Sequence, residues 1–247
     1  MRSLLLIPAN RDKDIENAFD HGADCLVFDL AQTATAADMP LARQRVLAAL
    51  YQARQIARPP LLYVRVSCLQ TGYVDADLDA IMPGRPDGLI LPHSQDGADV
   101  QHVSVKLAVR EAEYGLGDGA TKIIASVAAT PASIFHLSSH IGASQRLAGL
   151  ISGTADLAEA LEVETRNLPD GTLIPPLALA QSLVLFAAKA AGILAIDAPS
   201  SAGSGDAALW RDCKAARRDG FVAKVARTQH EVAIINAVFG KEDMAKS

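Results

Sequence analysis

The charged residues best suited to chemistry in this sequence share one kind of position, because each follows a short apolar run or the turn after it. A guanidinium group matches a carboxylate through two parallel hydrogen bonds, so clustered arginines indicate an anionic ligand. Alternatively, any one of these residues could form an ion pair with another charged residue of the protein instead of binding a ligand. The set consists of Arg11, Arg65 and Arg227 with Asp29, Asp156 and Asp197.

The segment from Gly149 to Leu161 carries the strongest local pattern. A strand is expected to end at Ser152, Gly153 to turn the chain, and a helix to begin near Thr154. Free N–H groups at a helix start attract anions, and glycine lets the backbone approach a ligand closely. We therefore expect the backbone of Gly153, Thr154 and Ala155 to bind substrate, and Asp156 to serve as a metal ligand or simply as a helix-start acid.

His93 is the histidine best placed for catalysis, since it also follows an apolar run. A histidine at such a position acts as a general base near neutral pH, or it fills the place of another polar residue and binds a neighbour. We take Arg65, Asp156 and His93 as candidate catalytic residues. The expected substrate-binding set is Arg11, Asp29, Arg65, Gly153, Thr154, Ala155 and Asp197.

The elements that must position these residues alternate along the whole chain. Short apolar runs predict strands, and a segment of helical period follows each of them. The predicted strands are Ser3–Ile7, Cys25–Asp29, Leu61–Val66, Gly88–Leu91, Lys122–Val127, Leu147–Ser152, Leu194–Asp197 and Val222–Ala226. The clearest helices are Asp12–His21, Pro40–Arg58, Ala98–Glu113, Pro131–Ile141, Pro176–Ala191 and Ala207–Asp219.

Eight strand–helix units predict an α/β protein, a closed (β/α)8 (TIM) barrel that forms one domain over residues 1–247. An open doubly wound sheet is the alternative, although no GxGxxG motif follows the first strand. Segment Glu164–Pro175 is interpreted as a surface loop, because Asn, Pro, Asp and Gly gather there. In such a barrel the residues after each strand meet at one rim, which is where active sites lie.

Composition limits the class of protein. The chain has 247 residues, of which 50% are hydrophobic and 21% charged, and this composition is typical of a globular domain. Its net charge of −5 gives no global attraction to nucleic acid or to an anionic membrane. Its three cysteines are far apart and show no metal-ligand spacing, which favours a reducing compartment. The first residues lack an apolar stretch long enough for a signal peptide or a membrane span, so neither is expected there. We expect a cytoplasmic protein.

The ordered series RSLLLIPANR, HGADCLVFDL, YVRV, GLILPH, SGTADL, AAGILAIDAP and GFVAKVA resembles the citrate lyase beta-subunit family. That family lies within the wider superfamily of HpcH/HpaI-type aldolases and malyl-CoA lyases. The resemblance implies a (β/α)8 barrel that uses Mg²⁺ to cleave or form a C–C bond beside a carbonyl. It also implies a small carboxylate or acyl-CoA as ligand and a homo-oligomer, trimer or hexamer. The family's substrate-binding arginine falls on Arg65 and its metal-binding aspartate on Asp156.

Several positions depart from the family pattern. The usual Asp-Leu-Glu-Asp is here Asp29–Gln32, with Ala and Gln in place of two acids, and the second metal-ligand glutamate is Ala129. The usual lysine is His93, and the usual His-Pro pair is Thr228-Gln229. Mg²⁺ prefers carboxylate oxygens in good octahedral geometry, so a site with Asp156 alone should bind it weakly.

Three functions remain open. The first is a carbon–carbon lyase of the aldolase type, acting on a small oxo-acid or a 3-hydroxyacyl-CoA thioester with a degenerate metal site. The second is a catalytically weak or inactive barrel that binds a small carboxylate, and the third is an acyl-CoA thioester hydrolase. The missing acids favour the second function, whereas Arg65, Gly153 and Asp156 favour a working active site.

Overall fold

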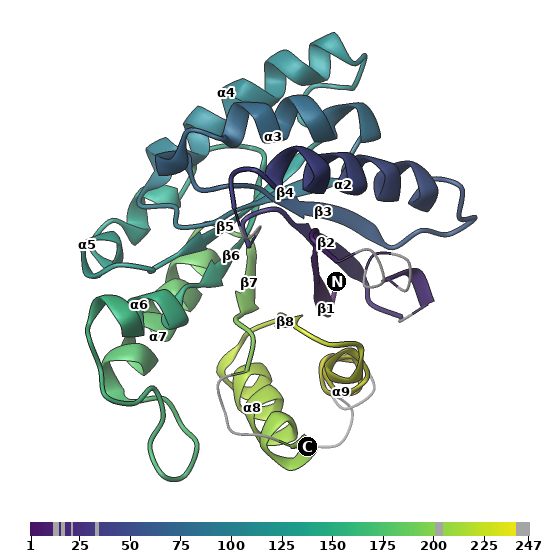
Figure 1. Cartoon of the computed structure of the whole chain (residues 1–247). Helices are drawn as coiled ribbons and strands as arrows, with labels where there is room; N and C mark the ends of the chain where they lie inside the picture. Colours follow the sequence, from purple (N-terminus) through teal and green to yellow (C-terminus); the bar gives the residue numbers. More distant parts are fainter. Residues whose placement is uncertain (12–14, 16–17, 21, 33–34, 201–204, 241–247) are drawn as a thin grey trace.

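The computed structural model describes residues 1–11, 15, 18–20, 22–32, 35–200 and 205–240. Parallel strands pair in the order in which they occur in the chain and close into a barrel (Figure 1). The predicted (β/α)8 barrel is therefore confirmed. The strands are β1 (Ser3–Pro8), β2 (Cys25–Asp29), β3 (Leu61–Arg65), β4 (Gly88–Leu91), β5 (Lys122–Val127), β6 (Leu147–Ser152), β7 (Leu194–Asp197) and β8 (Ala223–Ala226).

The strands are apolar on both faces because both faces are buried. Every second residue contributes to a cluster inside the barrel, to which Ile90, Ile124, Ile151 and Ile196 belong. The residue beside each of them along the strand belongs to the larger core instead, beneath the helices. This two-sided burial explains why the strands appear in the sequence as continuous apolar runs.

Helices cover the outside of the barrel (Figure 1). The α-helices are α2 (Met39–Ala53), α3 (Val74–Ile81), α4 (Gly97–Glu113), α5 (Pro131–Ile134), α6 (Thr154–Ala160), α7 (Pro175–Ala190), α8 (Asp206–Asp219) and α9 (Gln229–Phe239). Short 3-10 helices are η1 (Ala18–Asp20), η2 (Leu69–Thr71), η3 (Met82–Gly84) and η4 (Leu137–His140).

Two predicted helices differ from the structure. The helix predicted to reach Arg58 ends at Ala53, and Arg54 instead pairs with Asp87, 3.2 Å from Nη2 to Oδ1. The helix predicted over Pro131–Ile141 is split into α5 and η4. The hydroxyl of Ser139 accepts a hydrogen bond from the Gly97 N–H and donates one to the His136 carbonyl, so contacts with α4 replace a longer helix.

The helix predicted over residues 12–21 falls in large part outside the described residues. Within it, Ala18–Asp20 forms η1. The predictions for α4, α7 and α8 agree with the structure to within one residue at each end. No helix in the described part of the chain is long and apolar enough to cross a membrane.

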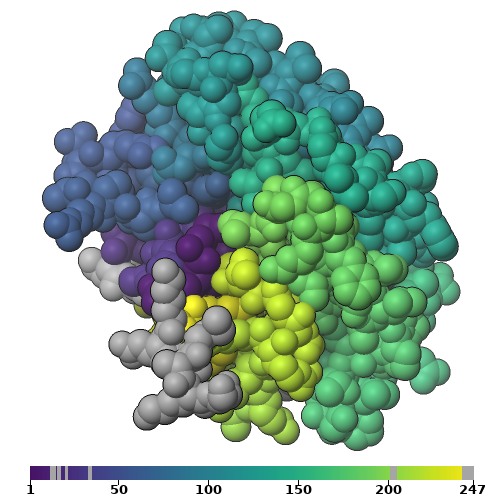
Figure 2. All heavy atoms as spheres, turned by 180° about the vertical axis from the view of Figure 1, so that it is seen from behind, coloured from purple at the N-terminus to yellow at the C-terminus, as the bar shows by residue number. Residues whose placement is uncertain are grey.

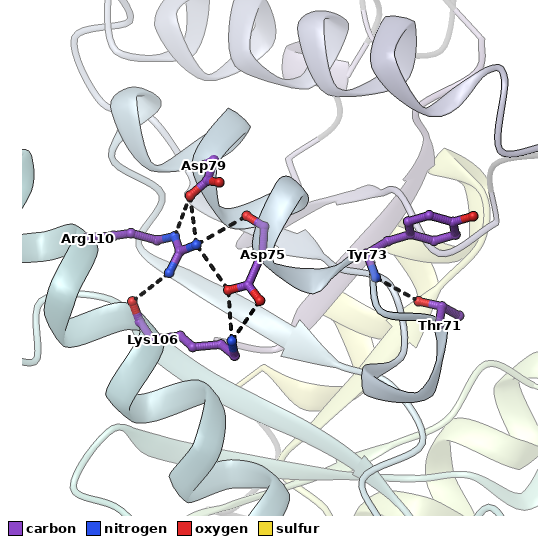
Figure 3. Close-up of polar contacts among 6 residues, drawn as sticks. All are labelled: Thr71, Tyr73, Asp75, Asp79, Lys106 and Arg110. Carbon is purple, nitrogen blue, oxygen red and sulfur yellow. Dashed lines mark hydrogen bonds and ion pairs between the residues drawn. The ribbon is translucent and has the colours of Figure 1, made fainter.

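An ion-pair network joins the outer faces of α3 and α4 (Figure 3). Lys106 Nζ lies 2.7 Å from Asp75 Oδ2, and Arg110 Nη2 lies 3.1 Å from Asp75 Oδ1 and 2.7 Å from Asp79 Oδ1. The carboxylates are largely exposed, so each pair stabilises the fold by less than about 1 kcal/mol. The network joins neighbouring helices on the outside of the barrel.

Closure brings the two ends of the chain together. Residues 3–5 of β1 pair with residues 224–226 of β8. From behind, the yellow C-terminal part lies directly against the purple N-terminal part (Figure 2). The rim at the carboxyl ends of the strands is therefore continuous, and residues from the first, middle and last strands can line one pocket.

Candidate active site

A pocket of about 350 Å³ lies at the carboxyl ends of the strands. Its walls combine apolar residues of the barrel interior, such as Ile90 and Ile151, with polar residues of the loops that follow the strands. Among the predicted site residues, the lining contains Asp29, Arg65, Gly153, Ala155 and Asp156. Volume and lining suit a small polar ligand.

Arg65 is held in place by Asp29. The two residues end adjacent strands and face each other in the register of β2 and β3. Arg65 Nε donates to Asp29 Oδ1 at 2.8 Å, and Nη2 donates to Oδ2 at 2.7 Å. The Asp29 side chain is 1% exposed and that of Arg65 is 21% exposed. Asp29 therefore orients the guanidinium, whose remaining N–H groups are the ones that can bind an anion.

Gly153 brings the end of β6 against β5. Its N–H donates to the Val127 carbonyl at 2.7 Å. A Cβ atom at this position would lie 2.8 Å from that carbonyl oxygen and 3.1 Å from Ala129 Cα, both backbone atoms. Only glycine fits here without a shift, and the tight turn aims the first turn of α6 at the pocket.

Asp156 and His93 approach each other beside the pocket. His93 Nε2 lies 3.7 Å from Asp156 Oδ2, and the side chains are 40% and 44% exposed. The His93 backbone has a φ of 51°, and Ala128 after the next strand has a φ of 58°. Left-handed conformations are costly for residues with a Cβ atom and often occur at functional sites. The backbone at this rim is therefore strained at two adjacent strand ends.

The remaining predicted site residues do not line this pocket. Thr154 and Asp197 line a neighbouring pocket between α7 and α8, which shares Ala198 and Pro199 with the first. Arg11 is exposed in the loop after β1. The pocket lining as described contains neither Arg11 nor His93.

Asp197 is committed to an ionic cluster beneath the helices. It accepts a hydrogen bond from Gln181 Nε2 at 2.6 Å and one from Lys224 Nζ. Lys224 also lies 2.9 Å from Asp212 of α8. Burial raises the pKa of Asp197, and the charge of Lys224 opposes that shift. The side chains of Asp197 and Lys224 are both almost fully buried. Their contacts join the end of β7 to β8 and α8, and neither residue lines the Arg65 pocket.

The structure adds polar residues that sequence reasoning did not propose as ligand contacts. Arg166 and Ser200 line the same pocket as Arg65, together with Arg227, which the sequence placed in the charged set but not among the substrate-binding residues. Arg166 lies in segment Glu164–Pro175, interpreted from sequence as a surface loop. The sequence shows only that Arg166 lies in a loop after the SGTADL motif. Neither the length nor the composition of that loop reveals that the Arg166 side chain turns toward the pocket.

The described residues fit a resident magnesium ion poorly. They contain no group of three or more His, Cys, Asp or Glu side chains that could hold a metal. Asp29 is occupied by Arg65, which leaves Asp156 as the available carboxylate of the pocket. Ala129, at the position of the expected glutamate, is 1% exposed and packs against Gly153. Weak Mg²⁺ binding therefore stays a prediction.

Known proteins of similar sequence include a lyase subunit and a thioesterase. The citrate lyase subunit beta of Escherichia coli is 27% identical over 238 residues, 96% of this chain and 76% of that protein. The (3S)-malyl-CoA thioesterase of Cereibacter sphaeroides is 28% identical over 244 residues, with the same coverages of 96% and 76%.

Solved structures share the fold. RipC from Yersinia pestis has a TM-score of 0.75 at 27% identity, covering 97% of this chain and 94% of that one. The protein CitE of Mycobacterium tuberculosis in complex with magnesium and acetoacetate has a TM-score of 0.80 at 23% identity, with coverages of 100% and 92%. The model of the HpcH/HpaI aldolase/citrate lyase family matches residues 2–228. With its closed barrel and its pocket at the strand ends, this chain belongs to the HpcH/HpaI aldolase/citrate lyase family.

Proposed function

We propose that this protein is a carbon–carbon lyase of the aldolase type that acts on a small oxo-acid or a 3-hydroxyacyl-CoA thioester. The observation that carries the proposal is the joining of Arg65, fixed by Asp29, with the Gly153–Asp156 turn in one pocket. The substrate carboxylate lies between the Arg65 guanidinium and the backbone N–H groups that begin α6, since the first N–H groups of a helix lack acceptors within it.

The reaction needs a proton acceptor and a group that stabilises negative charge. In the cleavage direction, the substrate hydroxyl loses its proton and becomes the carbonyl of the oxo-acid. The electron pair of the broken C–C bond moves to the carbon beside the thioester, which then takes up a proton. We assign the proton acceptor to His93 with Asp156 beside it, and stabilisation of the enolate to Arg65.

The ligands bound in related solved structures support a small carboxylate or a CoA thioester as the substrate. Structures of the Mycobacterium tuberculosis proteins contain oxaloacetate with magnesium, or magnesium with acetoacetate and coenzyme A. Small carboxylates and a CoA thioester are therefore the ligands to test first here. A cytoplasmic location and a homo-oligomeric assembly, trimer or hexamer, belong to the same proposal.

A thioester hydrolase is the second candidate, because the relatives at 28% identity include a protein named (3S)-malyl-CoA thioesterase.

Substituting Ala for His93 tests whether His93 acts in catalysis or only in substrate binding. We expect His93→Ala to lower kcat at least tenfold for the active reaction and to leave KM within about threefold. An unchanged kcat would remove His93 from the proposed mechanism.

A further inference from the structure

Arg166 brings a positive charge into the pocket, and no ion pair within the described residues involves it, although Asp156 is near enough to raise its pKa. Its Nε atom is buried, and among the described residues no hydrogen-bond acceptor reaches it. Its backbone is fixed, because the Arg166 carbonyl accepts the N–H of Ile174 at 3.1 Å. A buried guanidinium N–H without an acceptor is unfavourable, so the position of Nε points to an acceptor supplied by an anionic ligand.

Arg227 adds a second cation on the same side of the site. It follows β8, lines the pocket, and donates from Nη2 to the Ser200 carbonyl. Burial and the charge of Arg227 both lower the pKa of Arg166, whereas Asp156 raises it. Arg166 and Arg227 are therefore close enough to repel each other, and a shared anion would relieve that repulsion.

Two buried hydroxyl groups strengthen the case for a polar ligand. Ser200 and Ser152 line the pocket at 9% and 3% exposure. Neither hydroxyl has a hydrogen-bond partner within the part of the chain that the structure describes. Buried polar groups are nearly always satisfied, so unsatisfied ones that line a pocket indicate a missing hydrogen-bonding group.

We propose that Arg166 and Arg227, with Ser200, form a second anion-binding locus in the Arg65 pocket, and that Arg166 selects dianionic ligands. The inference rests on the proposed function, in which the first carboxylate binds at Arg65. The second carboxylate of a small dicarboxylate binds at Arg166. Arg65 is neutralised by Asp29 at 2.7 Å, whereas within the described residues no carboxylate pairs with Arg166 at such a distance, so the locus favours the ligand that carries the additional charge.

A matched ligand pair tests the selectivity. Malate and lactate are both 2-hydroxy acids, and malate differs by a carboxylate in place of one hydrogen of the methyl group. Calorimetry at fixed ionic strength, with metal chelated, should show malate binding at least about tenfold tighter than lactate, the range of one charge-assisted hydrogen bond. Arg166→Gln should lower malate affinity about tenfold and change lactate affinity less than about threefold.

Control variants separate this role from general charge effects and from misfolding. Arg211 lines the neighbouring pocket only, so Arg211→Gln should leave both affinities within about twofold. Arg166→Lys keeps the charge and loses the planar fork, and it should retain part of the malate preference. A thermal unfolding scan of each variant verifies the fold.

The outcomes distinguish this inference from the proposed function. If wild-type protein prefers malate and Arg166→Gln leaves that preference intact, or weakens both ligands equally, the second locus is excluded while binding at Arg65 stands. If Arg65→Ala changes neither affinity but Arg166→Gln removes the preference, the second locus stands and the proposed anchor fails. Failure of wild-type protein to bind either acid excludes both.

Discussion

At the scale of single residues, the decisive contact is the double hydrogen bond between Asp29 and Arg65. A buried carboxylate that holds both Nε and Nη2 leaves the guanidinium one orientation. Fixed donors stabilise developing negative charge more effectively than mobile ones, because no reorganisation is needed during the reaction. Asp29 is therefore interpreted as a positioning residue, and Arg65 as the residue that contacts the ligand.

Replacing Arg65 should weaken carboxylate binding. Arg65→Ala removes charge-assisted hydrogen bonds to the ligand and leaves Asp29 buried without its partner, so we expect a loss of roughly 1.5–3 kcal/mol in binding free energy. Calorimetric titration with oxaloacetate or pyruvate measures it. Asp29→Asn, which keeps the shape and removes the charge, should cause a smaller loss. Undiminished affinity in Arg65→Ala would place the ligand elsewhere.

Restoring one carboxylate should strengthen metal binding. Ala129→Glu places an acid at the position where the family resemblance implies the second metal ligand, and Mg²⁺ binds oxygen ligands of this kind. We expect tighter Mg²⁺ binding by titration calorimetry. Ala129→Gln has the same shape without the charge and should not show the gain. Because Ala129 is buried, a thermal scan must accompany both variants. Tight Mg²⁺ binding by the unmodified protein would mean that the ligands are misplaced.

At the scale of elements, the β6–α6 turn depends on Gly153. Gly153→Ala forces its Cβ to within 2.8 Å of the Val127 carbonyl oxygen, so backbone must move. We expect a loss of about 1–3 kcal/mol in unfolding free energy, together with weaker carboxylate binding. Gly117→Ala is the matched control, since a Cβ there meets no atom within 4 Å. Equal stability of the two variants in urea unfolding would show that the turn tolerates a side chain.

The carboxylate of Glu111 makes the stability of the fold depend on pH. Glu111, at the end of α4, accepts the N–H groups of Thr121 at 2.7 Å and Gly119 at 3.0 Å and pairs with Arg146 at 2.7 Å. Burial acts to raise the pKa of Glu111, but these contacts outweigh it and hold the pKa below its ordinary value. The carboxylate therefore stabilises the fold above the unfolded-state pKa of about 4.3, and this contribution is lost as pH falls through the lower folded-state pKa.

The Glu111→Gln variant checks this sign. Above pH 5 it should be less stable than wild type, because a neutral amide replaces a buried charge partner of Arg146. As the pH falls below about 4.3, the stability difference should shrink, since wild type loses its advantage there. Urea unfolding at a series of pH values measures both. A difference that stays constant from pH 6 to pH 3 would contradict the assignment.

The strands were predictable because burial on both faces leaves continuous apolar runs with few polar residues. β2, β4, β5, β6 and β7 agree with the prediction at both ends. Helix ends depend on tertiary contacts that the sequence does not display, as the Ser139 hydroxyl at the α4 contact demonstrates. The same limit applies to the site. Asp197 follows a strand as Asp29 does, but Lys224 holds it on the helix side of the barrel.

At the scale of the whole molecule, closure between β1 and β8 makes the pocket. The lining takes residues from β1, β2 and β3 and from the loops after β6, β7 and β8, which an open sheet would separate. The family assignment rests on a match over residues 2–228, nearly the full length of the barrel. That the chain forms one domain over residues 1–247 stays a prediction.

Product analysis with malyl-CoA tests the proposed lyase activity most directly. C–C cleavage yields a two-carbon oxo-acid and acetyl-CoA without a free thiol, whereas thioester hydrolysis yields malate and the free CoA thiol. We predict oxo-acid formation without thiol release, and at least a tenfold loss in Arg65→Ala, the scale of one electrostatic contact in a transition state. Thiol release without oxo-acid would establish a hydrolase instead, and no turnover of malyl- or citryl-CoA with Mg²⁺ present would contradict the lyase.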